Sequence, residues 1–172
     1  MNIPKSYGKS IKAAQLGEGI AKFFPVGSPV SDTSDIPSSS SGLPKETLGP
    51  ILRCIFEEIT EIRQVLSCLE IRMVGASLLI IYEADWTRAE QSLTLFGEQN
   101  NEEDEDEDED IDDGDDEDES STKQPGPPFV VRLIDFAHTR LAPGEGPDKG
   151  VLLGMDTILK LLDVRLAEIG AS

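Results

Sequence analysis

One carboxylate stands out because of the residues that precede it. Residues 130–139 read VVRLIDFAHT, an apolar β-rich run that ends at Asp135 and passes into a polar turn. Phosphoryl-transfer enzymes often present a magnesium ligand in this way, as an Asp at the end of a strand beside the nucleotide phosphates. An Asp in this place also forms turns and caps helices. Asp135 is therefore a candidate metal ligand, with a structural role as the alternative.

The only histidine of the chain lies close to this carboxylate. His138 follows Asp135 by three residues, so its imidazole can reach the same pocket and orient an acceptor hydroxyl or phosphate. A capping or core histidine is the alternative. A zinc site is excluded, because there is no second histidine and neither Cys54 nor Cys68 belongs to a CxxC pair.

Three segments have apolar residues at helical spacing: 10–24, 44–70 and 148–169. In the second segment, Gly49 and Pro50 predict a preliminary turn, with the regular helix starting at Pro50. The third segment is apolar on more than one side, which predicts packing between two surfaces.

Two further runs are rich in β-branched and apolar residues and predict strands. They span 72–82 and 129–134. We expect them to pair as antiparallel strands, because both read as buried strands and the segment between them reads as a solvated insertion. This pairing would bring the turn after Ile134 close to Ser77.

Two segments are too polar for a packed core. We expect residues 26–43 to form a flexible Pro/Ser-rich loop and residues 97–127 to form a disordered acidic insert. The run 102–119 has 16 acidic and no basic residues, so the rest of the chain carries a net charge of −3 rather than −19. The insert is a candidate surface for basic partner proteins, and no direct nucleic-acid binding is expected.

Other features of the sequence indicate a soluble intracellular protein. The first residues contain no apolar signal core, and no run approaches the roughly 20 apolar residues that span a bilayer. Membrane association is therefore not expected. Cys54 and Cys68 lie on one predicted helix roughly 20 Å apart, too far for a disulfide, and are expected to be reduced, buried thiols.

Four motifs occur in order along the chain: YGKS at 7–10, EGIAKFF at 18–24, SLLIIYE at 77–83 and IDFAHT at 134–139. Together they resemble the inositol polyphosphate kinase family. A later stretch, DKGVLLGM at 148–155, is similar to the Asp-x-Gly-Tyr-Leu-x-Gly-Leu stretch of that family, with Val151 in place of Tyr. The sequence AHT after Phe136 resembles the multikinase and hexakisphosphate-kinase branches most.

The resemblance implies an α+β fold, the carboxyl-terminal lobe of a two-lobed kinase, with a small antiparallel sheet packed by helices and long disordered insertions. Residues 1–172 would form the carboxyl-terminal part of the kinase domain. It also implies ATP and Mg²⁺ as cofactors, an inositol polyphosphate substrate and a nuclear or cytoplasmic location. Asp135 would bind the metal, Ser77 would approach the nucleotide phosphates, and His138 would act as a catalytic residue.

The sequence also departs from the pattern of the family. Its Pro-x-x-x-Asp-x-Lys-x-Gly substrate motif is absent, and Ala76 stands where a second serine is common. The ATP-binding amino-terminal lobe would lie upstream of Met1, so we expect a truncated chain. The resemblance does not choose among inositol phosphate acceptors. The alternative function is a non-catalytic scaffold whose acidic insert binds basic partners.

Overall fold

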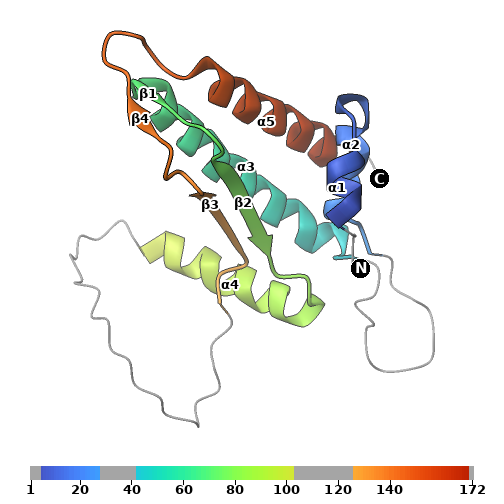
Figure 1. The fold of residues 1–172 in the computed structure, drawn as a ribbon. Helices are drawn as coiled ribbons and strands as arrows, with labels where there is room; N and C mark the ends of the chain where they lie inside the picture. Colours follow the sequence, from blue (N-terminus) through green and yellow to red (C-terminus); the bar gives the residue numbers. More distant parts are fainter. Residues whose placement is uncertain (1–4, 28–41, 103–125, 171–172) are drawn as a thin grey trace, which may run out of the picture.

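Two long helices lie side by side and form the centre of the molecule (Figure 1). The computed structural model describes residues 5–27, 42–102 and 126–170. Helix α3 spans Lys45–Cys68 and helix α5 spans Lys149–Gly170. Their facing apolar stripes form the core, as the helical spacing of both segments predicts.

An antiparallel strand pair packs against α3 and completes the core. Strand β2 (Ser77–Tyr82) pairs with β3 (Phe129–Ile134), so that Ser77 lies opposite Ile134. Alternate residues of the pair pack inward on the core, as expected for a sheet covered on one face. The inward set is Leu78, Ile80, Tyr82, Phe129, Val131 and Leu133. The expected antiparallel pairing and α+β architecture are thereby confirmed.

The first predicted strand is in fact divided. Residues 71–72 form a separate strand, β1 (Ile71–Arg72), which pairs with β4 (Arg140–Leu141). The expectation of one strand over 72–82 is therefore wrong at its beginning. Gly75 has φ 75°, a left-handed conformation that interrupts the extended backbone before Ser77.

The first predicted helix, 10–24, is broken into three pieces. They are α1 (Lys5–Ser10), a short 3₁₀ turn at Ala13–Gln15, and α2 (Leu16–Phe23). Lys12 is extended, and its N–H donates to the side-chain oxygen of Gln15 at 3.1 Å. This local bond starts a new turn instead of continuing α1.

Helix α3 is continuous through Pro50, so the predicted start at Pro50 is wrong. The helix begins at Lys45, and Leu48 and Gly49 are already buried. Packing of this first turn outweighs the loss of one backbone hydrogen bond at the proline. The two cysteines are free, as expected, but neither is buried, because Cys54 is half-buried and Cys68 is exposed.

Helix α4, Trp86–Glu102, was not predicted from the sequence. It packs against α3 and continues to Glu102, although we expected the acidic insert to begin at 97. The remainder of that insert, 103–125, and most of the loop predicted at 26–43 lie outside the described residues. Among the helices described, none is both long and apolar enough to span a membrane.

Candidate functional site

The predicted site lies at a break between the two strand pairs. Arg72 pairs with Arg140 on one side of the break, and Ser77 pairs with Ile134 on the other. Two short connections, 73–76 and 135–139, therefore join the same two strand pairs. The second connection contains both Asp135 and His138, so the register brings Ser77 next to the predicted metal ligand.

Asp135 has an unusual backbone conformation. Its φ is 60°, and it is the only non-glycine residue with positive φ in the described part of the chain. Asp tolerates this left-handed region better than most residues, but the conformation is still strained and often marks functional positions. The side chain is exposed and makes no hydrogen bond or ion pair with any described residue. Its carboxylate is thus available to a ligand.

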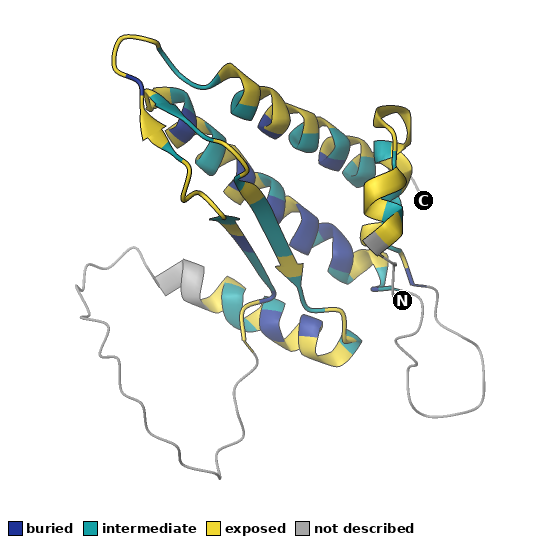
Figure 2. Ribbon diagram, viewed as in Figure 1, coloured by how far each residue is buried: buried dark blue, intermediate teal, exposed yellow. Residues whose placement is uncertain are grey.

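Residues 136–138 form a tight, exposed turn, and Thr139 after them is half-buried. The N–H of Thr139 donates to the carbonyl of Phe136 at 3.0 Å, and the Phe136 ring is 57% exposed. His138 is also exposed and has no partner among the described residues. The imidazole of His138 is therefore not a core or capping group in this structure. Figure 2 shows this exposed stretch between β3 and β4.

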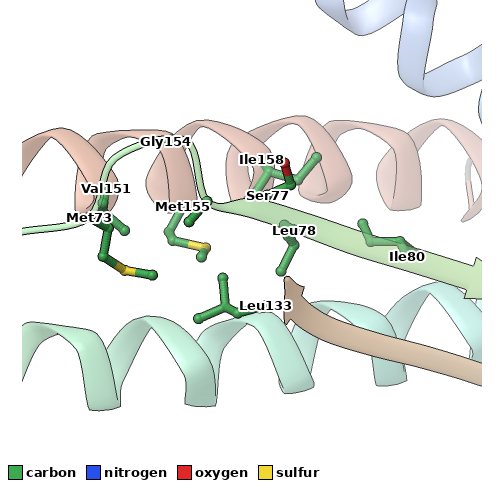
Figure 3. A pocket seen from close by; sticks show the side chains of 10 residues that line it. Met73, Ser77, Leu78, Ile80, Leu133, Val151, Gly154, Met155 and Ile158 are labelled. Carbon is green, nitrogen blue, oxygen red and sulfur yellow. The ribbon is translucent and has the colours of Figure 1, made fainter. Parts of the chain in front are cut away.

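Ser77 lies at the rim of an apolar cavity between the β2–β3 pair and α5 (Figure 3). The cavity has a volume of about 330 Å³, and Ser77 supplies the only side-chain oxygen of its lining. Met73, Leu78 and Leu133 close one side, and Val151, Met155 and Ile158 of α5 close the other. Because its lining has no charged group, the cavity itself offers nothing to neutralise a phosphate.

The ends of the broken hairpin are held by a network of three carboxylates and one guanidinium, which we call the clasp: Glu70, Arg72, Glu145 and Asp148. Glu70 accepts hydrogen bonds from the N–H groups of Gly144 and Gly146, at 2.8 and 3.2 Å. Arg72 donates to the carbonyls of Glu145 and Gly146. Asp148 accepts from Met73 N–H at 3.1 Å. The clasp thus fixes the segment 142–148 against β1 and the connection after it.

Arg132 is a candidate contact residue that our sequence analysis did not select. It lies on β3 opposite Leu79, is exposed, and has no hydrogen bond or ion pair with the described residues. Strand alternation places it on the outer face of the sheet, away from the core. The alternation along β3, in which the inward Val131 and Leu133 flank Arg132, was the signal that could have identified it.

The donor set around Asp135 is small. No group of three or more His, Cys, Asp or Glu side chains that could hold a metal ion occurs among residues 5–27, 42–102 and 126–170. Among these residues, Asp135 is therefore a single carboxylate without a closed cage of protein ligands around it. This arrangement suits a cation that takes its remaining ligands from substrate phosphates and water, as Mg²⁺ does.

Comparison with known proteins agrees with the resemblance seen in the motifs. The family model described as "Inositol polyphosphate kinase" matches residues 1–163. The inositol polyphosphate multikinase of Saccharomyces cerevisiae is 42% identical over 101 residues, which cover 54% of this chain and 28% of the yeast protein. The chain therefore spans less than a third of the length of this curated relative.

A solved structure has a similar fold. The crystal structure of the inositol phosphate multikinase Ipk2 from S. cerevisiae, in complex with ADP and Mn²⁺, superposes with a TM-score of 0.57 at 24% identity. The match covers 95% of this chain and 51% of the yeast chain. At this identity the likeness establishes the fold.

Proposed function

Because this chain belongs to the inositol polyphosphate kinase family, we propose that it takes part in transferring the γ-phosphoryl group of ATP to an inositol polyphosphate. The observation that carries the proposal is Asp135, an exposed carboxylate with no partner among the described residues, held with φ 60° at the break in the hairpin. A nuclear or cytoplasmic location belongs to the same proposal. The acceptor is an inositol phosphate hydroxyl or phosphate.

The residues present fit a divalent cation delivered with the nucleotide. Asp135 would hold it through one carboxylate, and the cation would neutralise charge on the β- and γ-phosphates. The yeast relative was solved with ADP and Mn²⁺, which supports a nucleotide and a divalent metal as ligands of this chain. Magnesium is the metal that we propose for the cell.

The neighbouring side chains have complementary roles in this proposal. Ser77, paired with Ile134, would donate its hydroxyl or backbone N–H to a nucleotide phosphate. His138 would orient the acceptor, because it lies in the same short connection as Asp135. The guanidinium of Arg132 would bind a phosphate of either substrate, since it has no partner among the described residues.

The proposal is tested by calorimetric titration of ATP into the 172-residue chain with and without Mg²⁺. Asp135→Asn keeps a side chain of the same shape that tolerates the left-handed backbone, but removes the charge. Asp163→Asn is the control, because Asp163 is an exposed residue of α5 with no partner in the described chain.

We expect Mg²⁺-dependent ATP binding by the wild type and by the Asp163 variant, and no measurable binding by Asp135→Asn. Equal binding by both variants would show that Asp135 is not the metal ligand. Absence of binding in all three proteins would contradict a nucleotide site in this chain.

The alternative role as a non-catalytic partner-binding protein is favoured by one observation, the 16 acidic residues between 102 and 119. Such a run would bind basic proteins through contacts that weaken with salt. Deletion of 103–119 should abolish capture of a basic protein such as a histone while ATP binding is retained. Unchanged capture after the deletion would exclude this role.

A further inference from the structure

Asp148 makes two separate sets of contacts with its two carboxylate oxygens. Oδ1 accepts from the N–H groups of Gly150 and Val151, at 3.0 and 3.3 Å, and so caps the first turn of α5. Oδ2 accepts from the N–H of Met73 at 3.1 Å, across 75 residues of sequence. A helix cap requires only the first set. The second set is a tether between the start of α5 and the 73–76 connection.

The tether acts on a short piece of chain next to the proposed site. Met73 is separated from Ser77 by three residues, and Gly75 among them has a left-handed conformation. Residues 73–76 belong to no regular strand or helix. Among the hydrogen bonds of the described residues, the bond from Met73 N–H to Asp148 is the one that joins the backbone of 73–76 to a distant part of the chain. The connection leads directly into strand β2, which begins at Ser77.

The tether also affects the ionisation of Asp148. The N–H of Met73 is the main reason why the pKa of Asp148 lies below its usual range, and the two cap N–H groups and the charge of Arg72 add to the effect. The partial burial of the carboxyl opposes this lowering. A hydrogen bond to an ionised carboxylate is worth more than one between neutral groups.

We propose that Asp148 is a positioning residue, which holds the 73–76 connection through Met73 and thereby sets Ser77 in place beside Asp135. This inference rests on the proposed function, because it concerns the same nucleotide and metal site. Asp148 itself does not contact the substrate. Its role is to keep the two sides of the broken hairpin in register where Ser77 pairs with Ile134, the residue before Asp135.

Two substitutions separate the tether from the helix cap. In Asp148→Ser the short hydroxyl still caps α5 but does not reach Met73, whereas Asp148→Ala loses both interactions. Asp163→Ser is the matched control, since it removes an α5 carboxylate that has no partner in the described chain. The probe is MnATP, titrated into the full chain and followed by the electron paramagnetic resonance signal of free Mn²⁺.

For Asp148→Ser we expect the Kd for MnATP to rise about tenfold, as loss of one charge-assisted hydrogen bond would produce. Its Tm should stay near that of the wild type and above that of Asp148→Ala. The amide of Met73 should exchange faster with solvent, while the amides of Gly150 and Val151 stay protected. Asp163→Ser should bind MnATP like the wild type.

Wild-type affinity in Asp148→Ser would overturn the positioning role and leave the proposed function intact. So would unchanged protection of Met73 in a variant whose affinity has fallen. Failure of the wild-type chain itself to bind MnATP would overturn the proposed function, and the inference with it.

Discussion

Two loops that follow strands in this molecule differ in whether their polar groups are hydrogen-bonded within the described chain. In 142–148, the backbone and side chains are bound into the clasp, through Glu70, Arg72 and Asp148. In 135–139, the carboxylate of Asp135 and the imidazole of His138 have no partner among the described residues. The contrast fits our proposal, in which the 142–148 loop supports the structure and the 135–139 loop presents groups to ligands.

The largest expected effect comes from the core that supports both loops. Leu162 is fully buried on α5, where that helix packs against α3. Leu162→Ala should lower the free energy of unfolding by about 2–5 kcal/mol, through lost apolar contacts and a cavity. Chemical denaturation measures this change. A loss below about 1 kcal/mol would mean that α5 is not an integral part of the core.

The next largest effect concerns the affinity for ligands rather than the stability of the fold. Replacing the unpaired guanidinium of Arg132 by Gln should weaken binding of MgATP or of an inositol polyphosphate by about tenfold. Calorimetry of both ligands measures it. The matched control is Arg53→Gln, because Arg53 is exposed on α3 and has no hydrogen bond or ion pair with the described residues. If both arginine variants bind like the wild type, the outer face of the sheet is not a phosphate-binding surface.

A third prediction concerns strain at Asp135. Its φ of 60° disfavours a residue with a Cβ by about 1–2 kcal/mol relative to glycine. Asp135→Gly should therefore unfold at the same or a higher denaturant concentration than the wild type, and Asp135→Ala at a lower one. Both should lose MgATP binding. Destabilisation by the glycine would show that the carboxylate has a structural role, as in the clasp.

The smallest effect is the pH dependence that the clasp contributes. The folded-state pKa of Asp148 is lowered, so its bonds add stability above the unfolded-state value of about 4 and lose it as the pH falls through the folded-state pKa. Replacing Asp148 by Asn should make the acid limb of the stability curve shallower. Thermal unfolding between about pH 2 and pH 6 measures the slope. An unchanged acid limb would mean that Met73 does not restrain this carboxyl.

The sequence predicted the elements whose pattern is repeated over several turns or along a whole strand. Helices α3 and α5 and the β2–β3 pairing follow from such patterns. Helix α4 also carried a readable pattern, because Asp85 caps it through the N–H of Arg88 and Trp86, Ala89, Leu93 and Phe96 have helical spacing. We did not predict this helix because its last residues merge into the acidic run that follows.

The break in the hairpin could be predicted from local sequence only in part. Gly75, whose left-handed backbone interrupts the strand, is a local signal. The hydrogen bond between Met73 and Asp148 spans 75 residues, and short-range propensity contains no information about it. The position of Asp135 at the end of a strand was readable, but its left-handed backbone was not. Its role as a metal ligand, with those of Ser77 and His138, stays a prediction.

The most direct measurement of the central claim is paramagnetic relaxation by Mn²⁺ in the presence of ATP, read from the backbone amide signals of the chain. We predict selective broadening at residues 134–139 and 76–78, weaker broadening at 144–148, and loss of the effect in Asp135→Asn. Broadening that centres on the clasp, or that persists unchanged in Asp135→Asn, would contradict the assignment of Asp135 as the metal ligand.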